Sequence, residues 1–486
     1  MRPTLLPAAL LRALALATAG LAVACSSSAP APAPPSPAPT SAPAPDQGLP
    51  GRLVAEVTGD GAFGHLAELQ RIADANGGNR ALGTPGYDGS VDYVARTLRD
   101  AGYTVDTPEF SARSFSVQDV RLTVDGTATA ATALSFSPAT PAGGVTGPLA
   151  VITQDTTSGC EADDFAGIPA GAVVLVRRGT CPFGQKSTTA AAARAAAVLV
   201  ANNADGPLDQ ATLGDVTGAV PTAGLSKADG DALAGRAGAS VNLVLATTIE
   251  ERRSRNVVAQ TTTGNSDNVV MAGAHLDSVS AGPGINDNGS GTASLLETAV
   301  RLGGTPAVAN AVRFGFWGAE EEGLIGSTRY VEGLSEGDRE KIALYLNLDM
   351  VGSPNAAYLA YDGDNSDNVG AGPGPDGSAT VERVLLEQLA ATGVTGEGTD
   401  FDGRSDYGPF IAANIPSGGL FTGAEEIKTP EQAQRWGGTA GQPYDRCYHQ
   451  ACDRIDGIDR TALDRNTDAV AGTIGRFALS TDGLPA

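Results

Sequence analysis

The chain has 486 residues, 42% of them hydrophobic, which is enough for two or more domains that each bury a core. Its formal net charge is -23 at pH 7 and its sequence pI is about 4.4. This acidity excludes a nucleic-acid-binding protein, because phosphate binding requires a basic surface.

Residues 1–25 have the layout of an export signal: an early arginine, an apolar stretch, and small residues before Cys25. Arg12 interrupts the apolar stretch too early for a membrane span. Two cleavage sites remain open. The small residues Ala22 and Ala24 suit ordinary secretion, whereas "LAVAC" resembles a bacterial lipobox, in which Cys25 would carry a lipid. A lipobox usually has leucine where this chain has Ala22. We expect an exported protein, either a cell-envelope lipoprotein or a secreted one.

Residues 26–50 are mostly proline, alanine and serine, a composition that predicts an extended, disordered linker. The five cysteines also indicate export, since an exported protein tends to pair its thiols. Four of them group by proximity into Cys160 with Cys181 and Cys447 with Cys452. Cys25 is left over, at the position where a lipid would attach.

Folded sequence is expected from residue 51. Two segments, 63–76 and 89–103, carry apolar residues at helical spacing, and the segment "NRALGTPGYDGS" between them is rich in turn residues. His65 lies on the first predicted helix. We interpret it as a surface or core histidine, because no acidic partner pattern surrounds it.

Residues 116–247 are predicted to form a separate β-rich domain. Short β-type runs at 149–154 and 171–179 alternate with a helix-like segment at 186–203. The carboxylates fall in predicted loops without metal-ligand spacing, so no catalysis is expected here. The stretch "RRGTCPFGQKSTTAAAARAAAVLVANN" resembles the protease-associated domain, a module inserted in several exopeptidases.

After residue 250 the chain alternates between strand, loop and helix. Strands are predicted at 268–277, at the start of 311–323 and at 342–352, with helices at 291–302 and 325–334. This alternation predicts an α/β fold with a largely parallel central sheet flanked by helices. Ligands of such folds bind beyond the carboxyl ends of the strands.

Acidic residues and histidines recur at these strand ends. They are His275, Asp287, the glutamates at 320–322, Asp349 and His449. Each one alone is most often a solvated or capping residue. Together they place carboxylates after buried strands, where unpaired charge is unfavourable and a divalent cation would neutralise it. Histidine and carboxylate ligands without cysteine suit zinc, and their number suits two ions that share one carboxylate. We assign the shared carboxylate to Asp287, in the glycine-rich "GINDNGSG".

Six ordered motifs resemble the co-catalytic zinc aminopeptidases secreted by bacteria, the leucyl type. They are "AHLDS", "GINDNGSG", "FWGAEEEGLIGS", "NLDMVG", "GRSDYGPF" and "CYHQACD". The resemblance implies a discontinuous catalytic domain of the zinc exopeptidase fold at 51–115 and 248–480, with the protease-associated domain inserted between. It also implies a monomeric peptide hydrolase that binds two zinc ions and removes the N-terminal residue of peptides with a free N-terminus.

The resemblance also implies a role for each residue of the site. The expected ligands are His275 and Asp349 for one zinc, Glu321 and His449 for the other, and Asp287 for both. Asp277 would orient His275, Glu320 would act as general base toward a metal-bridging water, and Tyr448 would stabilise the oxyanion. Glu322 makes three glutamates where the family has two, so a register shifted by one residue stays open.

The same resemblance implies a substrate pocket. Arg404 would position the substrate, and Met350, Gly403 and Phe421 would line an apolar pocket that favours leucine. Core packing is the alternative for Met350 and Phe421.

Near the C-terminus, Asp464 and Asp468 lie four residues apart on a predicted helix, where like charges repel unless a cation joins them. A calcium site there and a solvated helix surface both stay open.

Two other functions stay open from the sequence. A carboxypeptidase or dipeptidase of the same superfamily would use Arg404 to bind a C-terminal carboxylate. A catalytically silent binding or receptor homologue would lack metal ligands, whereas here the complete set is present. Contact with a membrane is expected only through a lipid on Cys25.

Overall fold

The computed structural model describes residues 44–208, 211–214, 216–370 and 372–485. The predicted export signal, Cys25 and most of the predicted linker lie outside these residues. The first helix, α1 (Leu49–Glu56), begins within the last residues of the segment predicted as linker. Within the described ranges, no helix is both long and apolar enough to span a membrane.

The first of two sheets contains eight strands in the order β1-β10-β12-β11-β13-β16-β14-β15. The neighbours of β11 and β13 in its centre are parallel, and the antiparallel pairs lie toward the edges. The bounds are β1 (Thr104–Asp106), β10 (Val257–Gln260), β12 (Asn310–Trp317), β11 (Asn265–His275), β13 (Ile342–Leu348), β16 (Ser417–Phe421), β14 (Leu359–Tyr361) and β15 (Glu397–Thr399). Four of the seven pairings are parallel and three are antiparallel, so the predicted α/β fold with a largely parallel or mixed sheet is confirmed in its mixed form.

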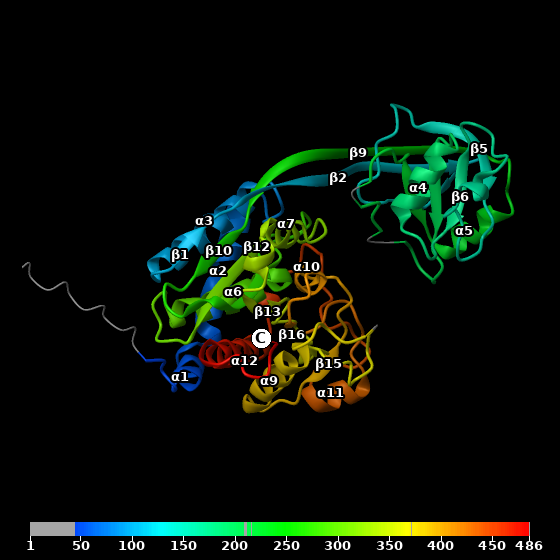
Figure 1. Cartoon of the computed structure of the whole chain (residues 1–486). Coiled ribbons are helices and arrows are strands. Elements are labelled where there is room, and N and C mark those ends of the chain that lie inside the picture. The colour runs from blue at the N-terminus through cyan, green and yellow to red at the C-terminus, as the bar shows by residue number, and fades with distance from the viewer. Residues whose placement is uncertain (1–43, 209–210, 215, 371, 486) are drawn as a thin grey trace, which may run out of the picture. The chain divides into compact units, whose positions relative to one another are not determined.

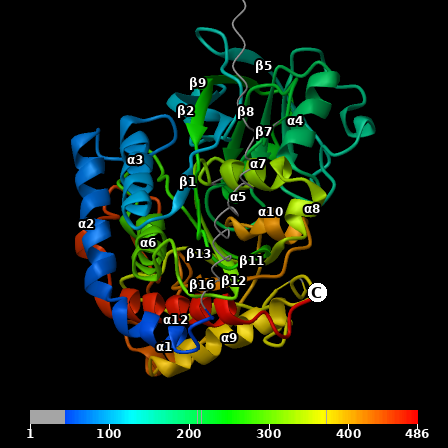
Figure 2. The same cartoon turned by 60° about the vertical axis from the view of Figure 1, so that its left-hand side comes forward.

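Helices cover both faces of this sheet. Successive side chains of β11 point to opposite faces of the sheet. Val270, Ala272 and Ala274 belong to the larger core on one face, and Met271 belongs to the smaller core on the other. The helices of the larger core are α1, α2 (Gly59–Ala75), α3 (Pro85–Asp100), α6 (Gly291–Leu302), α9 (Ser378–Ala391) and α12 (Arg460–Leu479). Figure 2 shows α12 running alongside α1 and α9, which both contact it.

The opposite face carries a smaller core built from Trp317, Tyr345 and Phe410. The ring of Tyr345 stacks on Phe410 with centroids 3.6 Å apart, and Trp317 donates a hydrogen bond to the Tyr345 hydroxyl over 2.8 Å. The shorter helices of the domain are α7 (Ile325–Gly333), α8 (Glu336–Arg339), α10 (Tyr407–Ala412) and α11 (Pro430–Trp436).

The second sheet also has eight strands, in the order β3-β2-β9-β5-β6-β7-β8-β4. The bounds are β2 (Glu109–Val124), β3 (Thr127–Thr129), β4 (Thr132–Ala133), β5 (Val145–Val151), β6 (Val173–Arg177), β7 (Ala197–Ala201), β8 (Thr222–Leu225) and β9 (Ser240–Arg255), with helices α4 (Phe183–Ala192) and α5 (Lys227–Ala234). The helix-like segment 186–203 is therefore helical only as far as Ala192. Its second half forms the buried strand β7, which pairs with parallel neighbours on both sides and packs Leu199 on one face of the sheet and Val198 and Val200 on the other.

The strands β2 and β9 pair antiparallel along most of their length, from Glu109 opposite Arg255 to Val124 opposite Val241. Figure 1 shows these two long strands side by side. Phe110 and Ala112, near the start of β2, pack with Leu82 from the loop between α2 and α3 and with Ala319, which follows β12. The chain therefore enters and leaves the second sheet through neighbouring strands.

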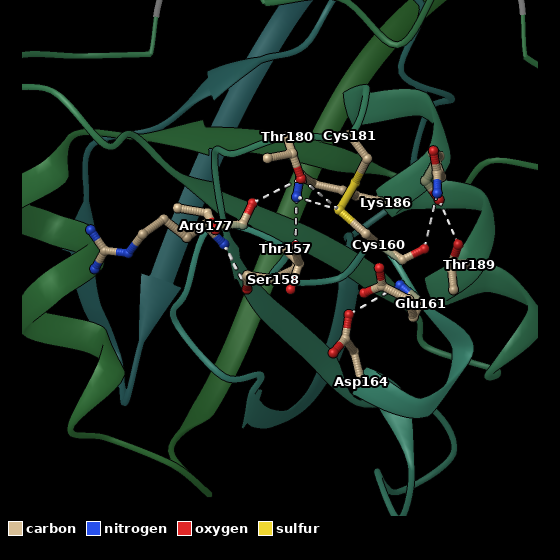
Figure 3. Close-up of a disulfide and its surroundings, with 12 residues drawn as sticks. Thr157, Ser158, Cys160, Glu161, Asp164, Arg177, Thr180, Cys181, Lys186 and Thr189 are labelled. Carbon is tan, nitrogen blue, oxygen red and sulfur yellow. Dashed lines mark hydrogen bonds between the residues drawn. A yellow bond between two sulfur atoms is a disulfide. The ribbon is translucent and has the colours of Figure 1, made fainter.

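The predicted disulfides are both present, between Cys160 and Cys181 and between Cys447 and Cys452. Next to the first, the fully buried ammonium of Lys186 donates a hydrogen bond to the Ser158 carbonyl over 2.5 Å and contacts the Cys160 sulfur at 3.6 Å (Figure 3). Lys186 thus joins α4 to the disulfide-closed loop, because its ammonium group is bound by atoms of that loop and does not face solvent.

Candidate metal centre

The predicted site residues follow strands whose carboxyl ends meet at one edge of the first sheet. β11 ends at His275, which lies opposite Trp317 at the end of β12. Glu320 comes soon after β12, and Asp349 comes directly after β13. Because these strands are parallel neighbours, residues far apart in the sequence come together here.

The carboxylate of Asp287 lies between two histidines. Its Oδ1 atom is 3.2 Å from His275 Nε2, and its Oδ2 atom is 3.1 Å from His449 Nε2. The segment that carries it, Ile285–Ser290, is a short irregular helical turn that continues into α6. Each oxygen of this carboxylate therefore serves a different histidine.

Two groups of potential metal ligands share Asp287. His275 and Asp349 form the first with it, and Glu321 and His449 form the second. In each group one ligand atom from every residue lies within 4.8 Å of the others. Asp349 Oδ1 is 3.4 Å from His275 Nε2, and Glu321 Oε2 is 3.0 Å from His449 Nε2. These two groups contain the residues assigned to the two ions from the sequence, and the assignment itself stays a prediction.

The chemistry of this donor set fits zinc. Imidazole nitrogens and carboxylate oxygens converge without a thiol. Among the candidate ligand residues, all of which the structure describes, three buried atoms have no hydrogen-bond partner: His275 Nδ1, Glu321 Oε1 and Asp349 Oδ1. Burial and the nearby charge of Asp287 raise the pKa of Glu321 to about 7. Burial lowers the pKa of His449, but hydrogen bonds to Asp287 and Glu321 raise it overall to about 10. Both shifts indicate a shortage of positive charge that divalent cations would supply.

Asp277 connects the histidine strand to the glutamates. Its Oδ1 atom is 3.8 Å from His275 Nδ1, and its two oxygens accept hydrogen bonds from the backbone N–H groups of Glu320 and Glu321 at 3.2 and 3.4 Å. The glutamate run is thus fixed by its backbone.

The three consecutive glutamates have different surroundings. The Glu320 carboxylate lines the cavity and lies 3.9 Å from His275 Nε2. Burial raises its pKa well above the usual range, and the charge of His275 opposes this shift. Glu321 lies against His449. Glu322 does not line the cavity, and burial raises its pKa to about 8.

The loop closed by Cys447 and Cys452 holds Tyr448 and His449 together. Their rings stack with centroids 3.9 Å apart, and His449 has a left-handed backbone with φ +57°. The Tyr448 hydroxyl accepts a hydrogen bond from Arg404 over 3.1 Å. Arg404 also pairs with Glu425 at 2.9 Å and Glu426 at 3.6 Å.

The candidate ligands open into a cavity of about 650 Å³. The four residues predicted for the substrate pocket, Met350, Gly403, Arg404 and Phe421, all line it. Sequence reasoning missed other lining residues, among them the apolar or aromatic side chains of Leu359, Tyr361 and Tyr444. The first two belong to β14, a short apolar strand whose sequence carries no signal that separates a pocket wall from a core.

Asp464 and Asp468 lie on α12, away from these ligands. Asp464 Oδ1 accepts a hydrogen bond from the Gly59 N–H group over 2.7 Å. Burial, aided by the charge of Asp464, raises the pKa of Asp468 to about 6. The sequence missed a third acidic cluster, formed by Asp362, Asp364 and Glu382. Its carboxylates, two from the loop after β14 and one from α9, accept backbone N–H groups of that loop.

His65 does have an acidic neighbour. Its Nε2 atom is 3.5 Å from Glu297 Oε2, and its Nδ1 atom is 2.6 Å from the Tyr93 hydroxyl. Glu297 belongs to α6, so the partner could not be found near His65 in the sequence. His65 belongs to neither group of potential ligands and is a packed histidine of the helical layer.

Comparison with known proteins identifies the family. A model described as peptidase family M28 matches residues 256–474, and one described as PA domain matches residues 145–233. The probable lipoprotein aminopeptidase LpqL of Mycobacterium tuberculosis is 52% identical over 432 residues, which cover 88% of this chain and 86% of that relative. The chain belongs to peptidase family M28. The predicted family, with its inserted protease-associated domain, is thereby confirmed.

Other proteins similar to this M28 peptidase agree. An aminopeptidase of Pseudomonas aeruginosa is 46% identical and covers 86% of this chain and 80% of its own length. Among solved structures, the aminopeptidase from Aneurinibacillus sp. strain AM-1 has a TM-score of 0.72 at 26% identity, over 88% of this chain and 96% of that one. A zinc aminopeptidase from Bacillus subtilis has a TM-score of 0.63 at 26% identity, with the same coverage. The M28 peptidase is therefore an enzyme with the α/β fold that the sequence predicted.

Proposed function

We propose that this M28 peptidase is a zinc-dependent aminopeptidase that removes the N-terminal residue of peptides and prefers leucine and other large apolar residues. The observation that carries the proposal is the Asp287 carboxylate, which faces His275 with one oxygen and His449 with the other. The names of the relatives support it, since they include leucine aminopeptidase 2 of Trichophyton rubrum, 42% identical over 86% of this chain and 84% of that relative.

The donor set is proposed to hold two zinc ions. His275 and Asp349 would hold one, Glu321 and His449 the other, and Asp287 both. When bound, a zinc pair polarises a carbonyl and lowers the pKa of water.

Glu320 is proposed as the general base. Its carboxylate lines the cavity beside His275, where it can take a proton from water and pass it to the leaving amine. The Tyr448 hydroxyl accepts its hydrogen bond from Arg404, so its own hydrogen remains for the oxyanion that develops on the scissile carbonyl. Asp277 is proposed to orient His275 and, through two backbone N–H groups, the glutamates.

The charges around the cavity favour a substrate amine over a carboxylate. Glu320 and Asp349 line it and would attract the N-terminal ammonium. Arg404 would be needed by a carboxypeptidase, yet it already pairs with Glu425 and Glu426. An apolar side chain at the N-terminus would lie against Met350, Leu359 and Phe421.

A further proposal concerns the export of the protein and its attachment to a membrane. The protein is proposed to be exported as a monomer, and Cys25 to be its lipid attachment site, which agrees with two disulfides and with the name of LpqL. For Asp464 and Asp468 on α12, a calcium site and a solvated helix surface both stay open, and one Asp464 oxygen already accepts the Gly59 N–H group.

A substrate pair tests the main proposal. Leucine-p-nitroanilide should be cleaved by the purified protein, and its N-acetylated analogue should not, because the blocked amine cannot be held as an ammonium. Equal cleavage of both compounds would refute the aminopeptidase assignment. Elemental analysis of the same preparation should find zinc.

A further inference from the structure

A buried arginine holds the backbone on one side of the candidate metal centre. Arg80 lies in the loop between α2 and α3, and its side chain has 0% exposure. Its guanidinium donates hydrogen bonds to the carbonyls of Leu276, Pro283 (2.9 Å) and Gly284 (2.5 Å). These carbonyls lie at both ends of the segment that connects His275 to Asp287.

The Arg80 backbone is fixed to the same segment. Its N–H group donates to the Ser278 hydroxyl over 2.9 Å, and its carbonyl accepts the Ser278 N–H group at 3.3 Å. The guanidinium therefore cannot shift without moving the loop. A cation removed from water is unfavourable unless hydrogen bonds replace its hydration, and here backbone carbonyls do so.

A buried carboxyl group holds the other side of the same loop. Asp453 has 4% exposure and follows Cys452 directly. Its Oδ1 atom accepts the Asn286 N–H group over 2.7 Å, and its Oδ2 atom accepts the Asp287 N–H group over 3.0 Å. The disulfide loop that carries His449 is thus tied to the backbone of Asp287 itself.

Together these contacts hold the residues before and at Asp287 through both kinds of backbone group. Arg80 holds the carbonyls of Pro283 and Gly284, and Asp453 holds the N–H groups of the two residues at 286 and 287. None of these contacts uses the Asp287 carboxylate, which stays available to both histidines.

We propose that Arg80 and Asp453 are positioning residues that place Asp287 between the two metal sites, so that zinc affinity depends on them. The inference rests on the proposed zinc pair. Because one carboxylate would be shared, a small displacement of its backbone would misalign it for both ions at once. Groups that orient metal ligands typically change metal affinity by about 10- to 100-fold when they are replaced.

Two conservative variants test this role. Arg80→Lys keeps the charge but loses the planar fork, so it cannot reach three carbonyls in fixed directions. Asp453→Asn keeps the shape, but its NH2 group would face a backbone N–H group, which leaves that loop contact unmade. Zinc dissociation constants should rise by about 10- to 100-fold in both variants, measured by competition with a chromophoric chelator. Excess zinc should restore part of their activity.

Two control variants separate positioning from general destabilisation. Tyr103→Phe removes a buried hydrogen bond of 2.7 Å to the Ala299 carbonyl and should lower the melting temperature without changing zinc affinity. Arg454 follows Asp453 in the sequence, and its side chain pairs with Asp74 at the surface. Arg454→Gln should therefore change neither the melting temperature nor the zinc affinity.

The outcomes are distinct from those of the proposed function. Weaker zinc binding in folded Arg80→Lys or Asp453→Asn, with unchanged binding in the controls, supports the inference. Wild-type zinc affinity in both variants overturns it, and so does an equal loss in Tyr103→Phe at a similar melting temperature. If Arg80→Lys fails to fold, Asp453→Asn decides. A wild-type protein that binds no zinc would contradict the proposed function itself.

Discussion

Arg404 donates a hydrogen bond to the hydroxyl of Tyr448, 3.1 Å away, and its guanidinium lies 5.8 Å from the centre of the Tyr448 ring. The hydroxyl therefore accepts from arginine, and its own hydrogen is not used in this contact. This orientation gives the first testable prediction.

Tyr448→Phe should lower kcat by about 10²-fold, because one preorganised donor to the oxyanion is lost. Zinc content should not change, since Tyr448 belongs to neither group of potential ligands. Steady-state kinetics with leucine-p-nitroanilide and elemental analysis check both expectations. A variant with wild-type kcat would remove Tyr448 from the proposed mechanism.

The three glutamates should separate by their effects. Glu320→Gln should retain zinc and lower kcat by about 10²- to 10⁴-fold, as expected for loss of a general base. Glu321→Gln should lose zinc on dialysis, because Glu321 faces His449. Glu322→Gln is the matched control and should keep both zinc and activity. If Glu321→Gln keeps its zinc and Glu322→Gln loses it, the register is shifted by one residue.

Removal of metal should abolish activity reversibly. Dialysis against a strong chelator should leave a protein that is inactive toward leucine-p-nitroanilide, and added zinc should restore turnover. Circular dichroism of the stripped protein should stay close to that of the zinc-bound form, because large hydrophobic cores hold the sheets without the ions. Activity that survives complete removal of metal would argue against the metal mechanism.

The two disulfides should have different effects when each pair is replaced by serine. Loss of Cys447–Cys452 should cost about 2 kcal/mol, and loss of Cys160–Cys181 about 3 kcal/mol, since the second closes a longer loop. Only the loss of Cys447–Cys452 should weaken zinc binding, because this disulfide closes the loop that carries His449. Thermal unfolding and zinc competition on the same variants measure both quantities, and equal zinc affinities would contradict the prediction.

Lipid attachment at Cys25 can be tested in cells. Cys25→Ser should release the protein from the membrane fraction, and globomycin should make a precursor of the unaltered protein accumulate. Unchanged fractionation and processing would indicate ordinary secretion.

The candidate ligands are predictable because most of them follow an apolar strand in the sequence. Parallel strands place such residues at a common edge, so the sequence pattern predicts that His275, Glu321 and Asp349 gather there, and each of them shares a group of potential ligands with Asp287. The motifs supply the rest of the ligand set. The alanine-rich segment 186–203 is predicted as helical throughout, because alanine favours a helix and short apolar runs do not distinguish the two states. Its second half is instead β7, stabilised by pairing with β6 and β8.

Arg80 and Asp453 cannot be recognised from the sequence. Their partners are backbone groups of one loop, which include the Pro283 carbonyl, 203 positions from Arg80, and the Asp287 N–H group, 166 positions from Asp453. Backbone groups leave no trace in residue identity. The partner of His65 is hidden for a similar reason, since Glu297 comes from a helix in another part of the sequence. Contacts of this kind depend on the tertiary structure alone.

The chain enters and leaves the protease-associated domain through two paired antiparallel strands, β2 and β9, so the domain is attached to the peptidase through a single ladder. Phe115 and Ile249 face each other across this ladder, next to the ends of the segment predicted as the insert. A short turn joining these two residues would close an ordinary β-hairpin. The first sheet, which carries His275, would keep all of its strands. Gain or exchange of the whole module could therefore occur in evolution, or in the laboratory, without a redesign of the peptidase that carries it.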